Sequence, residues 1–104
     1  MSKYHAVRTN GYASKREAHR AAELMILLQA GEITDLIEQP RFTLLPACEG
    51  FPRKLEYVAD FAYYEGHKAD GKYVVEDVKG YRTDVYRIKK RLMKQLLGIE
   101  ITEV

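Results

Sequence analysis

The sequence predicts a single α/β domain, of the α+β kind, with its elements in the order helix, three strands, helix, strand. Three observations predict it: two stretches with helical spacing of apolar residues, three intervening segments rich in Val, Tyr, Phe and Thr, and a short alternating tail. A length of 104 residues lies near the common size of one domain, so residues 1–104 are expected to share one core.

Both predicted helices carry apolar residues at helical spacing and stop at a glycine. The first spans residues 14–30, before Gly31, and the second spans residues 82–97, before Gly98. The expected buried face of the first consists of Ala18, Ala21, Met25 and Leu28, widened by Leu24 and Leu27. That of the second consists of Val85, Ile88, Leu92 and Leu96.

The three predicted strands occupy residues 38–45, 55–64 and 72–79 and should form a meander. A polar loop with two glycines, residues 65–71, separates the second from the third, so these two should be antiparallel neighbours. Residues 99–104 alternate apolar and polar side chains, which is typical of a short strand with one buried side.

Composition narrows the function classes without choosing among them. A hydrophobic fraction of 46% and a charged fraction of 31% are typical of a soluble globular protein. No apolar run approaches the ~20 residues that cross a bilayer, and no signal-peptide pattern is present, so we expect a cytoplasmic protein without a membrane partner. Cys48 is the only cysteine and the three histidines are scattered, so oxygen ligands would have to hold any metal.

An acid and a lysine two residues apart stand at the end of the third predicted strand. Because side chains alternate along a strand, Asp77 and Lys79 should share a face. Such a pair can place a carboxylate on a divalent cation and an ammonium beside an attacking water or a phosphate. The string alone is weak evidence, because Asp70-Gly71-Lys72 repeats it in a loop.

Asp60 lies in an otherwise apolar and aromatic segment of the neighbouring predicted strand. A buried carboxylate is costly unless it is paired or bound to a metal, so Asp60 and Asp77 converging on one ion would explain both residues. A structural salt bridge between Asp60 and Lys79 is the alternative, and residue types alone favour neither interpretation.

Glu17 allows two interpretations as well. It follows Ser14 by three residues, so the pair can form a capping box at the start of the first helix. A carboxylate in the first turn of a helix packed on the sheet could also approach the metal site. Glu23 and Glu32 are expected to be solvated.

Basic residues gather in two places. The second predicted helix carries six of them against Asp84 alone, and a further group, which includes Lys3 and Arg8, borders the first helix. A net charge of +2 is too small to indicate nucleic-acid binding by itself, and a solvated basic face is the alternative. The candidate DNA contacts are Lys15, Arg16, Arg87, Lys89, Lys90, Arg91 and Lys94.

The motif order Ser14-x-x-Glu17, Val58-Ala59-Asp60-Phe61 and Glu76-Asp77-Val78-Lys79-Gly80 resembles that of PD-(D/E)XK nucleases, particularly phage endonuclease I, which resolves Holliday junctions. Over nearly its whole length the chain is similar to a family of small phage and prophage proteins, a domain of unknown function with resolvase-like features. The shared segments are residues 10–18, 30–33, 39–40, 57–64 and 75–90. Asn10 and Ala13 depart from that family's N-terminal loop, which bears on loop contacts and not on the four site positions.

The resemblance implies a restriction-endonuclease-like core with a mixed central sheet flanked by helices. It also implies that Glu17, Asp60 and Asp77 bind Mg2+ or Mn2+ and that Lys79 assists the hydrolytic water, which makes these four the catalytic residues. We therefore expect an endodeoxyribonuclease for branched DNA in phage recombination or DNA processing, acting in the host cell cytoplasm.

Symmetric cutting of a four-way junction needs two active sites, so a homodimer is expected. Two alternatives remain open: a nicking or restriction-like nuclease on linear duplex DNA, and a DNA-binding accessory protein that does not cleave.

Overall fold

The computed structural model describes residues 14–104, so the basic residues Lys3 and Arg8 and the loop positions Asn10 and Ala13 lie outside the described part of the chain. The fold is α/β with a mixed sheet, as predicted. Its elements are α1 (Lys15–Gln29), β1 (Ile33–Glu38), β2 (Arg41–Leu45), β3 (Leu55–Val58), β4 (Phe61–Glu65), β5 (Lys72–Asp77), α2 (Asp84–Leu92), the π-helical turn η1 (Met93–Leu97) and β6 (Ile101–Glu103).

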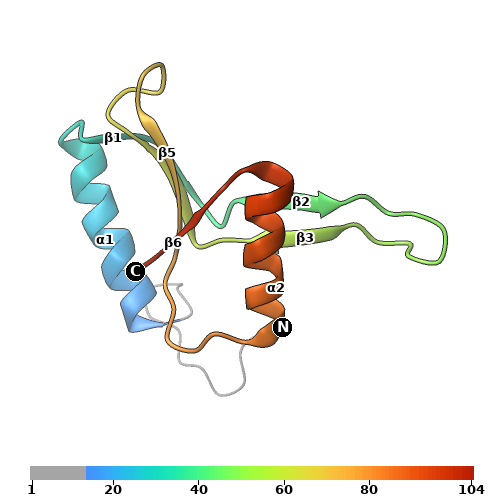
Figure 1. The fold of residues 1–104 in the computed structure, drawn as a ribbon. Helices are drawn as coiled ribbons and strands as arrows, with labels where there is room; N and C mark the ends of the chain where they lie inside the picture. The colour runs from blue at the N-terminus through green and yellow to red at the C-terminus, as the bar shows by residue number, and fades with distance from the viewer. Residues whose placement is uncertain (1–13) are drawn as a thin grey trace.

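The central sheet has four strands in the order β1-β4-β5-β6. The pairs β1–β4 and β4–β5 are antiparallel, which confirms the predicted neighbours, and β6 runs parallel to β5. The two helices lie on opposite sides of this sheet (Figure 1). Each side therefore has its own buried core.

The second predicted strand, residues 55–64, is two strands, β3 and β4, and the first, residues 38–45, corresponds to β2. Strand β1 was not predicted, apart from Glu38. The chain bends sharply between β1 and β2 and between β3 and β4. Gln39 has φ +53° and precedes Pro40, whose fixed φ and missing N–H interrupt a continuous ladder. Pairing continues through the bend, since Gln39 N donates to Asp60 O at 2.9 Å and Ala59 N donates to Pro40 O at 3.1 Å. The outer half of this bent ribbon, β2–β3, leaves the sheet and extends past α2 (Figure 1).

The third predicted strand is β5, which ends at Asp77 and not at Lys79. The pairing with the tail extends beyond the strand, because Val104 N donates to Asp77 O at 3.0 Å and Lys79 N donates to Val104 O at 3.3 Å. The predicted tail strand is confirmed as β6, with Ile101 buried.

Helix α1 begins at the predicted place and buries nearly the predicted face. Ser14 is its N-cap, with Oγ accepting a hydrogen bond from Glu17 N at 3.1 Å. Its buried residues include Ala21 and Leu24, whereas Met25 is 46% exposed, contrary to the prediction. We call this side of the sheet the α1-side core; it contains Ala21, Leu24, Ile33, Phe61, Tyr63 and Val74.

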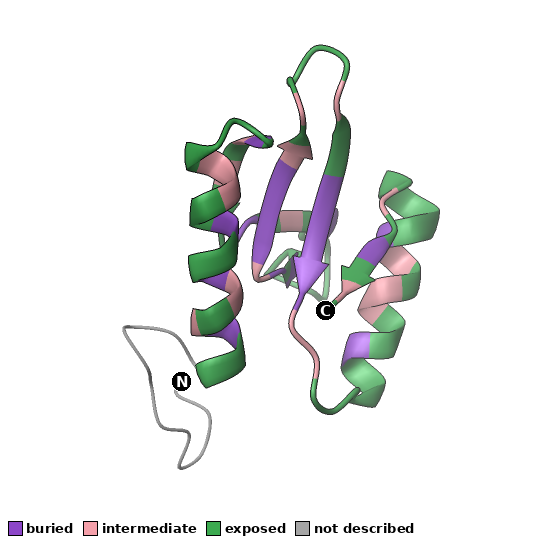
Figure 2. Ribbon diagram, turned by 90° about the vertical axis from the view of Figure 1, so that its left-hand side faces the viewer, coloured by how far each residue is buried: buried purple, intermediate pink, exposed green. Residues whose placement is uncertain are grey.

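Helix α2 buries a face that shares Leu92 with the predicted one, since Leu92 packs against the core on that side of the sheet. Val85 and Ile88 are 61% and 60% exposed, whereas Tyr86 and Met93 are buried. Figure 2 shows that much of the α2 surface is exposed. The spacing of aliphatic residues predicted the wrong face because Tyr86 can bury its ring while its hydroxyl hydrogen-bonds a carboxylate. The α2-side core contains Leu44, Tyr57, Ala59, Ala62, Val75, Tyr86, Met93 and Ile101.

No helix within residues 14–104 is both long enough and apolar enough to cross a membrane.

The buried face of α2 can be tested by substitution. Met93 is 0% exposed, so Met93→Ala should lower the free energy of unfolding by about 2–5 kcal/mol. Ile88→Ala, the matched aliphatic control on the exposed face, should change it by less than about 1 kcal/mol. Urea denaturation of both variants measures the difference. A larger loss for Ile88→Ala would mean that α2 buries the face predicted from aliphatic spacing.

Candidate functional site

Asp77 and Lys79 form the centre of the candidate site. Asp77 is the last residue of β5 and is 3% exposed, and Lys79 Nζ lies 3.6 Å from its Oδ2. Val75, two residues before Asp77, belongs to the α2-side core, so the Asp77 side chain also points towards α2. The ion pair confirms that Asp77 and Lys79 share a face.

Asp60 lies opposite Asp77, at the bend that precedes β4. The β4–β5 register ends at the pair Phe61–Glu76, and Asp60 and Asp77 are the residues next to that pair on their two segments. Asp60 N donates to Glu76 O at 3.1 Å, and Asp60 Oδ2 accepts from Val78 N at 2.7 Å. The two acids therefore stand at the same end of adjacent strands, as predicted. Within the described residues Lys79 forms its ion pair with Asp77, not with Asp60 as the salt-bridge alternative required.

Glu17 lies on α1, which packs on the other side of the sheet from α2 (Figure 1). It is buried in the stripe of α1 that packs on the α1-side core, whereas Asp77 points towards α2. Within residues 14–104, no cluster of three or more Asp, Glu, His or Cys side chains is arranged to hold a metal ion. The hydrogen bond from Glu17 N to Ser14 Oγ confirms Ser14 as the N-cap and involves only the main chain of Glu17.

Two residues without a predicted role, Tyr86 and Glu103, complete the surroundings of Lys79. Lys79 Nζ lies 3.9 Å from the centroid of the Tyr86 ring, a cation–π contact. The Tyr86 hydroxyl donates to Glu103 Oε2 at 2.7 Å. Burial, followed by this hydrogen bond, raises the pKa of Tyr86, so its hydroxyl stays protonated at neutral pH.

Glu103 connects Tyr86 to two basic side chains. Arg82 Nε donates to Glu103 Oε1 at 2.8 Å, and Lys90 Nζ donates to Glu103 Oε2 at 2.9 Å. The hydrogen bond from Arg82, followed by those from Tyr86 and Lys90, lowers the pKa of Glu103 to about 2. Glu103 faces Asp77 in the parallel β5–β6 register, so this network borders the acidic pair. No local pattern signals it, because Glu103 on β6 is distant in sequence from Arg82, Tyr86 and Lys90.

A second buried carboxylate lies on the opposite face of β5. Glu76 is 1% exposed and accepts hydrogen bonds from Arg20 Nε at 2.8 Å, from Arg20 Nη2 at 2.6 Å and from the Tyr63 hydroxyl. The hydrogen bond with Glu76 raises the pKa of Arg20, and burial raises that of Tyr63. This cluster joins α1 to the sheet and was missed; an acid inside the apolar run of β5 was its signal.

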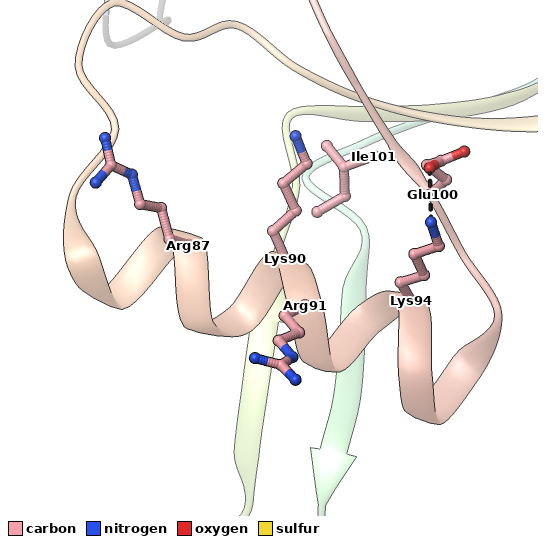
Figure 3. A pocket seen from close by; sticks show the side chains of 6 residues that line it. All are labelled: Arg87, Lys90, Arg91, Lys94, Glu100 and Ile101. Carbon is pink, nitrogen blue, oxygen red and sulfur yellow. Dashed lines mark hydrogen bonds and ion pairs between the residues drawn. The ribbon is translucent and has the colours of Figure 1, made fainter.

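The predicted basic face of α2 lines an open pocket of about 370 Å³ together with β6. Figure 3 shows Arg87, Lys90 and Lys94 extending to one side of the helix and Arg91 to the other. Glu100 pairs with Lys94 at 3.2 Å and Glu103 with Lys90, so acids offset part of the positive charge. The pocket is lined by Arg87, Lys90, Arg91, Lys94, Glu100 and Ile101.

The remaining predicted DNA contacts lie in different settings. Lys15 is exposed, and Lys89 is half-buried and outside the lining of this pocket. Arg16 has a structural role, because its guanidinium donates to Lys79 O at 3.1 Å and to Val104 O at 3.2 Å. These bonds fix the start of α1 to the segment that carries Lys79.

The fold and this site define a small α/β domain with an acidic pair and a lysine at one end of a mixed sheet. Residues 1–101 match the family described as "Protein of unknown function (DUF1064)", and the chain belongs to that family. No curated protein and no solved structure matches the chain. A family of unknown function was part of the expected resemblance; the likeness to nucleases stays a prediction.

The lowered pKa of Glu103 predicts how this network depends on pH. A carboxylate whose folded pKa is about 2 and whose ordinary value is 4.5 contributes stability above pH 4.5 and loses it as the pH falls towards 2. Glu103→Gln should therefore lower the melting temperature most at pH 6 to 7, and the gap from wild type should narrow as the pH falls to 3. Thermal unfolding, monitored by circular dichroism at each pH, measures this difference in melting temperature.

The matched control for this prediction is Glu100→Gln. Glu100 lies three residues before Glu103 and forms an exposed ion pair with Lys94. Exposed pairs contribute about 0–1 kcal/mol, so this variant should behave almost as wild type. A gap between Glu103→Gln and wild type that stayed constant from pH 7 to pH 3 would show that Glu103 does not contribute through its charge.

Proposed function

We propose that this protein is a metal-dependent endodeoxyribonuclease of the PD-(D/E)XK type, with Asp60, Asp77 and Lys79 as its central catalytic residues. The observation that carries the proposal is the buried Asp77 opposite Asp60 on the next strand, with the Lys79 ammonium 3.6 Å from its carboxylate. A carboxylate with so little exposure at the open end of a sheet favours a functional role.

The residues present fit Mg2+. Asp60 and Asp77 supply hard oxygen donors, and magnesium in proteins is commonly held by one or two carboxylates, with water and substrate phosphate as further ligands. When bound, the ion would polarise a phosphate oxygen and offset developing negative charge. The hydrogen bond from Val78 N to Asp60 Oδ2 orients that carboxylate. Mn2+ has a similar preference for oxygen and is the alternative ion.

The position of Lys79 beside Asp77 supports a role in phosphodiester hydrolysis. Its ammonium would orient the attacking water and offset charge on the phosphate. The water oxygen bonds to phosphorus and releases a proton to solvent, the bond from phosphorus to the 3′ oxygen breaks, and the 3′ oxygen takes up a proton from solvent. The products are a 3′-hydroxyl and a 5′-phosphate.

Glu17 belongs to the proposal as a residue to be tested. It was predicted as a third metal ligand or a helix-capping residue, and it is 5% exposed. Glu17→Gln tests the ligand role, because loss of a metal ligand would lower cleavage in a protein of unchanged stability. Glutamine also serves at this position of a capping box, so a cap alone predicts cleavage and stability close to those of wild type.

The basic pocket beside α2 supports DNA as the substrate. Arg87 and Lys94, each with a side chain 67% exposed, extend from the same helix that contacts Lys79 through Tyr86. Cations on one helix can contact successive phosphates, and such contacts weaken as salt rises. The pocket and the acidic pair therefore suit one polyanionic ligand.

Cleavage of labelled DNA tests this function directly. Wild-type protein with Mg2+ should cut, and EDTA should abolish cutting because the carboxylates then hold no ion. Asp60→Asn, Asp77→Asn and Lys79→Ala should each lower the rate by a factor on the order of 100 or more. A gel assay with single-turnover kinetics measures these rates.

The loop sequence Asp70-Gly71-Lys72 offers a matched control, because it repeats the same acid-x-lysine spacing away from the site. Asp70→Asn and Lys72→Ala should cut at the wild-type rate. Full cleavage by Asp77→Asn and Lys79→Ala would place the active site elsewhere.

A DNA-binding protein that does not cleave is the second candidate, and the basic pocket beside α2 favours it, because phosphate contacts there need no metal ion. Salt-sensitive binding by well-folded wild type, with no cutting in Mg2+ or Mn2+, would establish this candidate in place of the nuclease.

If the protein is a nuclease, we propose that its substrate is branched DNA and that the active species is a homodimer. Symmetric cutting of a four-way junction needs two active sites at a fixed separation, and each chain supplies one. Sedimentation should therefore show two chains on one junction, and the junction should be cut faster than matched linear duplex. One chain per junction, or equal rates on both DNAs, would favour a nicking or restriction-like enzyme.

A further inference from the structure

We propose that Tyr86 is a positioning residue, which holds the Lys79 ammonium over the acidic pair, and that Glu103 fixes Tyr86 from its other side. The catalytic part of this inference rests on the proposed function, because it needs Lys79 to act in hydrolysis. The contact itself is independent of any activity.

Lys79 needs such a contact because a lysine side chain is a flexible chain with a single charged end. The ion pair with Asp77 measures 3.6 Å, longer than the 2.7–2.9 Å of a charge-assisted hydrogen bond. That distance leaves the direction of the ammonium poorly fixed. The face of the Tyr86 ring, 3.9 Å from Nζ, limits its movement on the α2 side.

Tyr86 is itself held at three places. Its backbone N–H donates to the N-cap Thr83 Oγ at 3.0 Å, which fixes the residue in the first turn of α2. Its ring is buried and lies 6.2 Å from the ring of Tyr57. Its hydroxyl donates to Glu103 Oε2 at 2.7 Å. The ring can therefore act as a fixed surface.

Glu103 is well suited to hold this ring beside a site that binds an ion. Arg82 and Lys90 hold its two carboxylate oxygens, so its charge is balanced by partners of its own. It faces Asp77 in the β5–β6 register. We therefore assign Glu103 to the support of Tyr86 and leave it out of the metal ligands.

Nuclear magnetic resonance tests the contact without any requirement for cleavage. Protons above an aromatic ring face resonate upfield, so the Lys79 Hε signals should lie upfield of those of other lysines and show an Overhauser effect to the Tyr86 ring. Tyr86→Phe should keep this shift, and Tyr86→Leu should abolish it. Tyr73→Leu removes a ring of β5 that pairs with Tyr64 and not with Tyr86, so it should leave the Lys79 signals close to their wild-type positions.

The wild-type Overhauser effect keeps the inference falsifiable even if Tyr86→Leu fails to fold. Lys79 Hε signals at ordinary positions in the wild type, without the Overhauser effect, would overturn the inference whether or not the protein cuts DNA.

Kinetics test the positioning role. Tyr86→Leu should lower kcat about tenfold to a hundredfold with little change in KM, and Tyr86→Phe should restore most of the rate. In a Lys79→Ala background, Tyr86→Leu should have no further effect, because its action passes through Lys79. An equal loss in both backgrounds would mean that Tyr86 serves stability alone. Absence of cleavage by wild type would count against the proposed function, while the resonance test still decides the contact.

Discussion

Two consecutive buried carboxylates at the end of β5 constrain the rest of this fold. Glu76 and Asp77 are 1% and 3% exposed and point to opposite faces of the sheet. Removing a carboxylate from water costs several kcal/mol unless charged or hydrogen-bonding partners compensate. Arg20 of α1 provides two hydrogen bonds to Glu76, and Lys79 provides the charge beside Asp77. The positions of both helices are thus linked to the charges of a single strand.

The bend in the β1–β2 and β3–β4 ribbon explains how a third acid, Asp60, comes to lie beside the end of β5. In a continuous ladder, a main-chain carbonyl would accept the hydrogen bond from the partner strand. At the bend the Asp60 carboxylate accepts from Val78 N in that role, while Asp60 N and O pair with Glu76 and Gln39. Irregular pairing of this kind often re-aims a side chain beside a functional site. The direction of Asp60 therefore depends on the backbone conformation at Gln39 and Pro40.

The parts of the site that follow from strand alternation could be predicted from the sequence, and those that need distant partners could not. Alternation places Asp77 and Lys79 on one face, and a glycine-containing loop pairs β4 with β5. The network around Glu103 was missed because Arg82 and Tyr86 lie 21 and 17 residues away from it. Aliphatic spacing chose the wrong face of α2 because a buried tyrosine with a hydroxyl partner is absent from that pattern. For Glu17, residue type fits a helix cap and a metal ligand equally, so the sequence alone does not choose between them.

Glu103 also relates the basic pocket to the candidate site, because it binds both Lys90 and Tyr86. A phosphate that binds in the pocket competes with Glu103 for the Lys90 ammonium. Arg82 holds the other carboxylate oxygen, so Glu103 keeps a cationic partner if Lys90 turns towards DNA. The Tyr86 hydroxyl can then remain on Glu103, and the ring can remain beside Lys79. Binding of the proposed DNA ligand in the pocket is thus compatible with an unchanged position of Lys79. The more exposed Arg87 and Lys94 can form phosphate contacts without breaking the hydrogen bonds of Glu103.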